Sequence, residues 1–315
     1  METRRGVLAA LATIAAVALA GCAGTVPGST PTTAGAGAPS TSPAAATVNV
    51  VASTNVWGDV ASQVGGSLVA VTSIIDNPDA DPHEYQASSR NQLALSKAQV
   101  VIENGGGYDD FVDTMLEASG NSAAKVLNAV EISGHEATAG EELNEHVWYD
   151  YATVAKVATD LKDAFTTASP EGAATFEANT KAFLSALDGL NAKAAELKAK
   201  YAGKGAAITE PVPLYLLGEM GLVNKTPDAF SEAIENDTDV PAKVLAETLA
   251  LFSNHEVAVL AYNSQTAGPQ TEKVLAAAKA AGIPAVPVQE TLPSGKNFQE
   301  WQGDIIDALG QALAQ

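Results

Sequence analysis

Four residues occupy sequence positions that suit ligands of a metal ion: His83, His146, Glu210 and Glu290. The first histidine lies in Asp81-Pro82-His83-Glu84-Tyr85, after a turn-rich segment, and the second lies in Asn144-Glu145-His146-Val147-Trp148, ahead of a predicted helix. Glu210 directly follows a predicted strand, and Glu290 comes two residues after the end of another. Open α/β sheets bind their ligands beyond the carboxyl ends of strands, where the two glutamates fall. Taken alone, each histidine is more often a surface or core residue than a ligand, and the joint pattern of all four residues is what favours a metal site.

Two imidazoles and two carboxylates form a donor set that accepts Mn²⁺, Fe²⁺ or Zn²⁺. Monodentate carboxylates would give the tetrahedral shell that zinc prefers, whereas bidentate carboxylates would raise the coordination number. The two negative charges balance a divalent ion, which lowers the cost of burying the loaded site. Of the other two histidines, His135 lies in a polar loop and His255 in a helix-to-strand turn, and we expect both to be solvated.

The composition excludes several classes of function. The chain has 315 residues, with 17 Lys and Arg against 37 Asp and Glu, and a formal net charge of -20. This charge would repel a phosphate backbone, so nucleic acid is not an expected partner. The single cysteine rules out an internal disulfide framework and a cysteine-rich metal site, so nitrogen and oxygen must hold any metal.

Other classes of function are compatible with the same donors. A metal-dependent hydrolase would leave a coordination position open, but the chain has no H-E-x-x-H, G-x-S-x-G or P-loop pattern, and we do not expect an enzyme. A surface adhesin with an incidental ion is a second alternative. A receptor for an organic solute would need aromatic pocket walls, and the 3 Trp, 7 Tyr and 7 Phe residues are spread along the chain without clustering.

A run of three glycines, Gly105-Gly106-Gly107, follows a predicted strand and resembles part of a nucleotide-binding loop. It lacks the third spaced glycine of that motif, and Asp109 and Asp110 bring carboxylates to the place where a phosphate would sit. A nucleotide site is therefore not predicted here.

Short β-branched runs alternate with alanine-rich helical patterns from residue 48 onward, which predicts an α/β fold with largely parallel sheets. Predicted strands cover residues 48–52, 68–75, 99–103, 206–209, 257–261 and 283–288. The longest helical pattern runs from Pro170 to Tyr201. At about 1.5 Å per residue it would span some 45 Å, which suits a rigid helix shared by two Rossmann-like lobes. We expect an N-terminal lobe over 47–169, a connecting helix over 170–202 and a C-terminal lobe over 203–315.

The first 46 residues predict export and anchoring. Arg4 and Arg5 precede an apolar stretch over 7–20, and Leu19-Ala20-Gly21-Cys22 closes it with small residues. Similarity to bacterial lipoboxes implies a signal peptide over 1–21 and a lipid on the Cys22 thiol. Residues 22–46 lack charge and large apolar groups, so we expect a flexible tether. An uncleaved membrane helix is the alternative, although a bilayer requires about 20 apolar residues.

From residue 48 to the C-terminus the sequence resembles the zinc/manganese-type (cluster A-I) solute-binding lipoproteins of bacterial ABC importers. The resemblance rests on the two histidine segments quoted above, on residues 97–105 and 288–292, and on the long helix. It implies a monomeric receptor, lipid-anchored on the extracytoplasmic face of the cell membrane, that delivers a divalent metal to an ABC permease.

The same resemblance assigns the ligands residue by residue. The two ligand histidines of the family fall on His83 and His146, and its fourth ligand position falls on Glu290. The third position holds histidine in many zinc binders and glutamate in many manganese binders, and here it falls on Glu210. Residues 131–145 contain one histidine, where many zinc-specific members carry a long histidine-rich loop. Zinc and manganese are therefore both expected, with iron as a further candidate.

Overall fold

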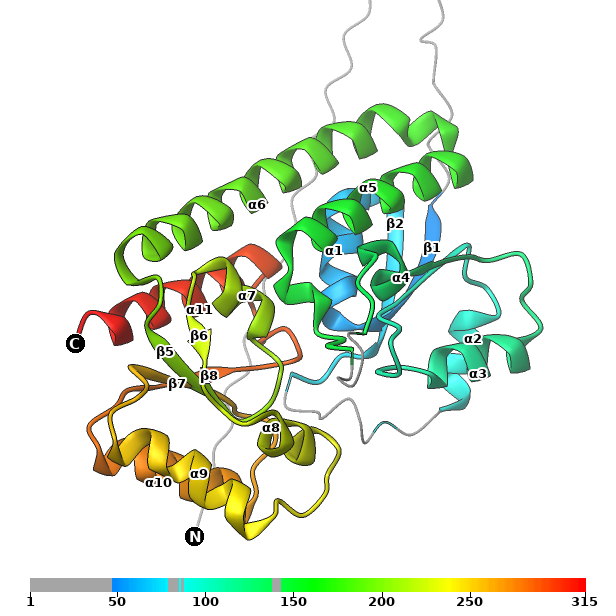
Figure 1. Ribbon diagram of the computed structural model, residues 1–315. Coiled ribbons are helices and arrows are strands. Elements are labelled where there is room, and N and C mark those ends of the chain that lie inside the picture. The colour runs from blue at the N-terminus through cyan, green and yellow to red at the C-terminus, as the bar shows by residue number, and fades with distance from the viewer. Residues whose placement is uncertain (1–46, 79–84, 86–87, 138–142) are drawn as a thin grey trace, which may run out of the picture. The chain divides into compact units, whose positions relative to one another are not determined.

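Two four-stranded parallel sheets with the same strand order carry the fold (Figure 1). The computed structural model describes residues 47–78, 85, 88–137 and 143–315. The first sheet has the order β2 (Val69–Ile75), β1 (Val48–Thr54), β3 (Val100–Glu103), β4 (Lys125–Asn128). The second has the order β6 (Val223–Asn224), β5 (Gly205–Ile208), β7 (Val259–Asn263), β8 (Ala285–Val288). In both sheets the chain starts on an inner strand, so each has a topological switch point where ligands commonly bind.

Helices connect these strands, as parallel pairing requires. The helices of the N-terminal lobe are α1 (Asn55–Gly65), α2 (Ser89–Leu95), α3 (Phe111–Ser119), α4 (Ala129–Ser133) and α5 (Tyr151–Ala168), with 3₁₀ turns η1 (Gly66–Leu68), η3 (Val147–Tyr149) and η4 (Pro170–Gly172). Those of the C-terminal lobe are α7 (Leu214–Glu219), α8 (Asp228–Glu235), α9 (Ala242–Ser253), α10 (Pro269–Ala280) and α11 (Phe298–Leu313). The α/β prediction is confirmed, although the sequence analysis did not predict β4, β6, α4, α8 or α11.

The long helix α6 (Ala173–Tyr201) has 29 residues and joins the two lobes. It packs against α1 and α5 of the first lobe and against α7 and α11 of the second (Figure 1). Its buried residues recur at helical spacing: Phe176, Thr180, Phe183, Leu187, Leu190 and Ala194. Gly203 ends it in the left-handed region, at φ +84°. The predicted helix shared by two α/β lobes is confirmed.

One hydrophobic core extends through both lobes. It includes Val50 and Val154 from the first lobe, Leu187 from α6, and Ile208 and Leu309 from the second lobe. The described residues of both lobes accordingly belong to one compact unit. Since burying one such side chain contributes about 1.5–3 kcal/mol, the shared core holds the two lobes firmly in register.

Aromatic residues that are spread along the sequence come together in the fold. A chain of ring contacts, with centroids 5.1–6.3 Å apart, joins Tyr108, Trp148, Tyr149, Trp301 and Phe298. These rings come from distant parts of the sequence, so their spacing along the chain could not reveal the cluster. All five are buried in the core. They therefore stabilise the junction of the lobes and form no wall of an open pocket.

None of the described helices has both the length and the apolar composition needed to cross a membrane. The predicted signal peptide, the tether and Cys22 lie outside the described residues.

Candidate metal centre

His146 lies at the start of η3 with its side chain fully buried, at 0% exposure. Its Nδ1 lies 2.8 Å from Asn144 Oδ1, which also accepts the His146 backbone N–H at 3.2 Å. The orientation of the Asn144 amide is fixed, because its Nδ2 donates to the Pro211 carbonyl at 3.2 Å. Oδ1 can only accept, so Nδ1 carries the proton in neutral His146. The Nε2 lone pair therefore points into the site, as a metal ligand requires.

Asn144 also ties this loop to the second lobe. Its backbone carbonyl accepts a hydrogen bond from the Tyr215 hydroxyl of α7 at 2.8 Å, in addition to the bond from its side chain to Pro211. Since Pro211 directly follows Glu210, one asparagine positions the histidine of one lobe relative to a glutamate of the other.

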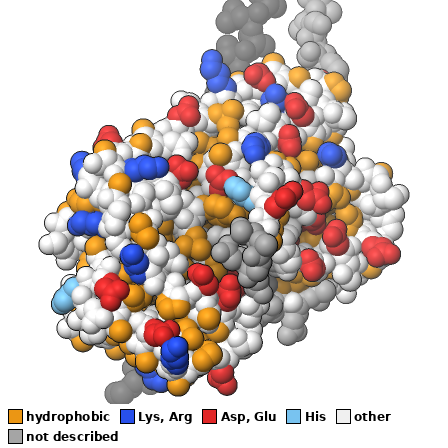
Figure 2. All heavy atoms as spheres, in the orientation of Figure 1, with side chains coloured by type: hydrophobic (Ala, Val, Ile, Leu, Met, Phe, Trp, Pro, Cys, Tyr) orange, Lys and Arg blue, Asp and Glu red, His pale blue; other side chains and the backbone are white. Residues whose placement is uncertain are grey.

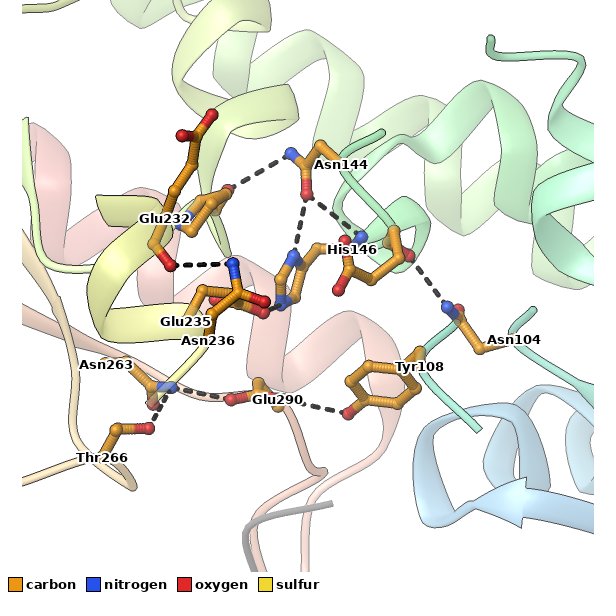
Figure 3. Close-up of polar contacts among 12 residues, drawn as sticks. Asn104, Tyr108, Asn144, His146, Glu232, Glu235, Asn236, Asn263, Thr266 and Glu290 are labelled. Carbon is orange, nitrogen blue, oxygen red and sulfur yellow. Dashed lines mark hydrogen bonds and ion pairs between the residues drawn. The ribbon is translucent and has the colours of Figure 1, made fainter. Parts of the chain in front are cut away.

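Glu290 follows β8 and is 2% exposed. Its Oε1 accepts a hydrogen bond from Asn263 Nδ2 at 2.7 Å, and its Oε2 accepts one from the Tyr108 hydroxyl at 3.1 Å (Figure 3). The neighbouring Gln289 carbonyl accepts a hydrogen bond from Tyr149 at 2.8 Å. Two tyrosines of the first lobe thus position a carboxylate of the second.

Glu210 follows β5 and is 3% exposed. Its Oε2 is buried and accepts no hydrogen bond from the residues that the structure describes. Burial, followed by the nearby charges of Glu235 and Glu290, raises the pKa of Glu210 to about 8, against the lowering effect of hydrogen bonds from Asn263 and Thr266. An unpartnered carboxylate oxygen among other acids is a place where a cation would be strongly favoured.

Glu235, the last residue of α8, was missed by the sequence analysis. Its Oε1 lies 3.5 Å from His146 Nε2, and its side chain is 10% exposed. Ligand atoms of Glu145, His146 and Glu235 all lie within 4.8 Å of one another. No sequence signal points to this residue. The eight-residue helix α8 carries no motif, and the strand before it, β6, has only two residues and is not predicted from the sequence.

A cavity of about 590 Å³ opens beside these residues and is lined by both lobes. Gly106, Asn144 and Glu145 line it from the first lobe, and Pro211 and Glu235 line it from the second. Among the residues that the structure describes, no aromatic side chain lines it. Figure 2 shows acidic side chains near the middle of this face of the molecule, in keeping with the net charge.

The glycine run forms a loop around a carboxylate instead of a phosphate. Asp109 accepts the backbone N–H groups of Asn104 at 2.6 Å and Gly105 at 2.8 Å, so the prediction against a nucleotide site is physically explained. Gly105 has φ +78°, and a Cβ there would come within 2.2 Å of Asn128 Oδ1. The loop turns Tyr108 toward Glu290, which is its role in this site.

The other three histidines of the chain are His83, His135 and His255. His83 lies outside the described residues. His135 and His255 are both exposed, as predicted, and neither belongs to the group around His146. His135 has a partner, however, since its Nε2 lies 2.9 Å from Asp150 Oδ2 and its ring stacks on Tyr215.

Known proteins share this architecture and parts of this sequence. The manganese-binding lipoprotein MntA of Halalkalibacterium halodurans is 29% identical over 144 residues, which cover 45% of this chain and 47% of that protein. The zinc-binding lipoprotein AdcA of Streptococcus pneumoniae serotype 4 is 22% identical over 274 residues, covering 80% of this chain and 53% of AdcA. The chain thus spans about half the length of these two relatives.

A solved structure and a family model cover more of the chain. The structure of the periplasmic zinc binding protein TroA from Treponema pallidum matches with a TM-score of 0.72 and 17% identity, over 85% of this chain and 100% of TroA. This likeness establishes a common fold. The model of the family described as zinc-uptake complex component A, periplasmic, matches residues 50–312, and the chain therefore belongs to that family.

Proposed function

We propose that this protein captures a divalent transition metal ion outside the cytoplasm and delivers it to an ABC permease. The observation that supports the proposal is a set of buried side chains from both lobes: the charges of Glu235 and Glu290 act on Glu210, Glu235 lies 3.5 Å from His146 Nε2, and Asn144 leaves that nitrogen available. Membership of the family supports the transport role, and the printed names of relatives include a manganese binder and a zinc binder.

The proposed ligands are His146, Glu210, Glu290 and His83, the last of which enters on its sequence position alone. This set carries a charge of about -2 when both glutamates are ionised, which matches a divalent ion. Two imidazoles and two carboxylates suit Mn²⁺ and Zn²⁺, and Fe²⁺ as well. The glutamate at position 210 gives the site the harder, oxygen-rich character that manganese accepts.

The proposed task is binding and release, without turnover. A hydrolytic metal site keeps a coordination position open for water, whereas four protein ligands fill the tetrahedral shell of zinc. The metal ion is the cargo. The aromatic core and α6 serve to hold the two halves of the site at a fixed separation.

We further propose that the protein is a monomer held at the extracytoplasmic face of the membrane by a lipid on Cys22, with residues 22–46 as the tether. Replacement Cys22→Ser should release the protein into the soluble exported fraction and leave its metal affinity unchanged. Retention of the variant in membranes would instead support an uncleaved membrane helix.

The decisive experiment is metal analysis of protein purified without chelator, followed by calorimetric titration of the metal-free protein with Mn²⁺ and Zn²⁺. We expect one bound ion per chain and strong loss of binding in His83→Ala and His146→Ala. The matched controls are His135→Ala and His255→Ala, which should bind like the wild type. Failure of the wild type to bind either ion, or metal-dependent hydrolysis of an ester, phosphate or peptide, would contradict the proposal.

A further inference from the structure

Glu235 belongs to none of the four ligand positions expected from the sequence, yet it lies beside the ligand atom of His146. Its Oε1 is 3.5 Å from His146 Nε2, and both side chains are largely withdrawn from solvent. Figure 3 shows the Glu235 carboxylate directed toward the His146 ring, from the other lobe. Placing a carboxylate at 10% exposure costs desolvation free energy, so its position beside His146 should have a physical reason.

The separation itself suggests the reason. A hydrogen bond between nitrogen and oxygen is normally about 2.7–3.2 Å long, so 3.5 Å is too long for a good one. Two ligands on one tetrahedral ion, each with a bond of about 2.1 Å, stand roughly 3.4 Å apart. The observed distance therefore leaves the space that a shared cation would occupy.

A second observation points to the same ligand. Glu210 Oε2 is buried without a hydrogen-bond partner among the described residues, and Glu235 is one of the two charges that act most on Glu210. The site thus contains a buried acceptor that no described donor satisfies and on which the charge of Glu235 acts, as a bound cation would require.

We propose that Glu235 is an additional ligand of the transported ion and that it favours Mn²⁺ over Zn²⁺; this inference rests on the proposed function. Together with the expected ligands Glu210 and Glu290 it would supply a third carboxylate, so this set would offer one imidazole nitrogen and three to six oxygens in addition to His83. Zinc gains little from donors beyond four, whereas manganese takes an octahedral, oxygen-rich shell. The extra carboxylate therefore contributes more to the binding of manganese.

The test is the variant Glu235→Gln, which keeps the size of the side chain and removes its charge. Titration of the metal-free full-length protein should give a loss of about tenfold or more in Mn²⁺ affinity and less than about threefold in Zn²⁺ affinity. The control is Glu232→Gln, one turn earlier on the same helix. Figure 3 shows the Glu232 carboxylate directed away from His146, so this variant should keep the wild-type preference.

Coordination can be followed independently with Co²⁺, whose visible absorption is more intense in four-coordinate than in six-coordinate sites. We expect the absorption to increase in Glu235→Gln as the coordination number falls. Circular dichroism of the metal-free variant checks that it folds. If it does not fold, Glu235→Asp keeps the charge, retracts the carboxylate and should lower the affinity for Mn²⁺ selectively.

The possible outcomes separate the two proposals. An unchanged ratio of Mn²⁺ to Zn²⁺ affinity in Glu235→Gln would overturn the role of Glu235 as a selective ligand. An increase in both affinities would overturn it too, because Glu235 would then only compete with the metal for His146. Absence of binding by the wild type would contradict the proposed function itself.

Discussion

The two lobes share one sheet topology but use their buried carboxylates in opposite ways. In the N-terminal lobe, Glu103 ends β3 and Asp109 follows it, and internal donors bind both: Asn128 Nδ2 donates to Glu103 at 2.9 Å, and two backbone N–H groups donate to Asp109. In the C-terminal lobe, Glu210 follows β5 and keeps Oε2 without a hydrogen-bond partner among the described residues.

The difference shows that the shared topology provides equivalent positions and that hydrogen bonding to described residues leaves a buried oxygen available at Glu210 but not at Glu103 or Asp109. The carboxylates of the first lobe hold a loop, and that loop presents the Tyr108 hydroxyl to the other lobe. In the second lobe, burial raises the pKa of Glu210, and the charges of Glu235 and Glu290 raise it further. The first lobe thus provides donors and an imidazole, and the second provides negative charge.

The largest effect should come from removing a ligand from either lobe. His146→Ala and Glu210→Ala should each reduce metal affinity by more than the roughly 10–100-fold that loss of an outer hydrogen-bond partner costs. Each leaves the ion with an open coordination position. Titration calorimetry of both variants measures the loss, and wild-type affinity in Glu210→Ala would show that the second lobe does not provide charge as inferred.

Glu103 is a buried carboxylate of the first lobe that we expect to have no part in metal binding. Burial raises the pKa of Glu103 from 4.5 to about 7, partly offset by the Asn128 hydrogen bond. The folded-state pKa of Glu103 lies above the unfolded value, so the folded protein holds this proton more tightly. The contribution of Glu103 to the stability of the fold is therefore largest below pH 4.5 and is lost as the pH rises through 7. Glu103→Gln should therefore be more stable than the wild type at pH 8, by up to about 3 kcal/mol.

Urea unfolding of both proteins between pH 4 and pH 8 measures this difference, which should grow with pH and level off above about 7. Metal affinity should stay at the wild-type value. A loss of metal binding in Glu103→Gln would mean that the carboxylates of the two lobes are not functionally distinct.

Much of the two-lobed fold can be predicted from the sequence. Runs of β-branched residues predict the strands of both sheets, and the spacing of Phe176, Phe183 and Leu187 predicts α6. Glu210 and Glu290 could be proposed as metal ligands from the sequence, because the local pattern of residues predicts where the strands end. Glu235 could not, since the packing of α8 brings it to His146. The clustering of the aromatic rings likewise arises only from long-range packing.

A smaller effect should follow from changing the support of a ligand. Asn144→Ala removes the acceptor that keeps the proton on His146 Nδ1, so the ring can rotate or adopt the other tautomer. We expect metal affinity to fall about 10–100-fold. The control Asn121→Ala removes hydrogen bonds to the Leu95 and Ala98 carbonyls away from the site, and should affect stability alone. Equal metal affinity in the two variants would contradict the orienting role.

The smallest effect should come from the hydroxyl that links the two lobes. Tyr108→Phe removes the hydrogen bond to Glu290 Oε2, while the aromatic ring and its contact with Trp148 remain. Loss of one such bond costs about 1 kcal/mol in stability, and Glu290 should become less well oriented, with a fall of about tenfold or less in metal affinity.

Tyr151→Phe is the matched control, because the Tyr151 hydroxyl donates to Gln302 Oε1 at 2.9 Å in the buried core. Both variants should lower the melting temperature of the metal-free protein by a similar amount, but only Tyr108→Phe should weaken metal binding. If the two variants bind metal equally well, the first lobe does not act on Glu290 through this bond. Its contribution to the site would then reduce to the imidazole of His146 and the asparagine that orients it, while Tyr108 would serve only the packing of the core.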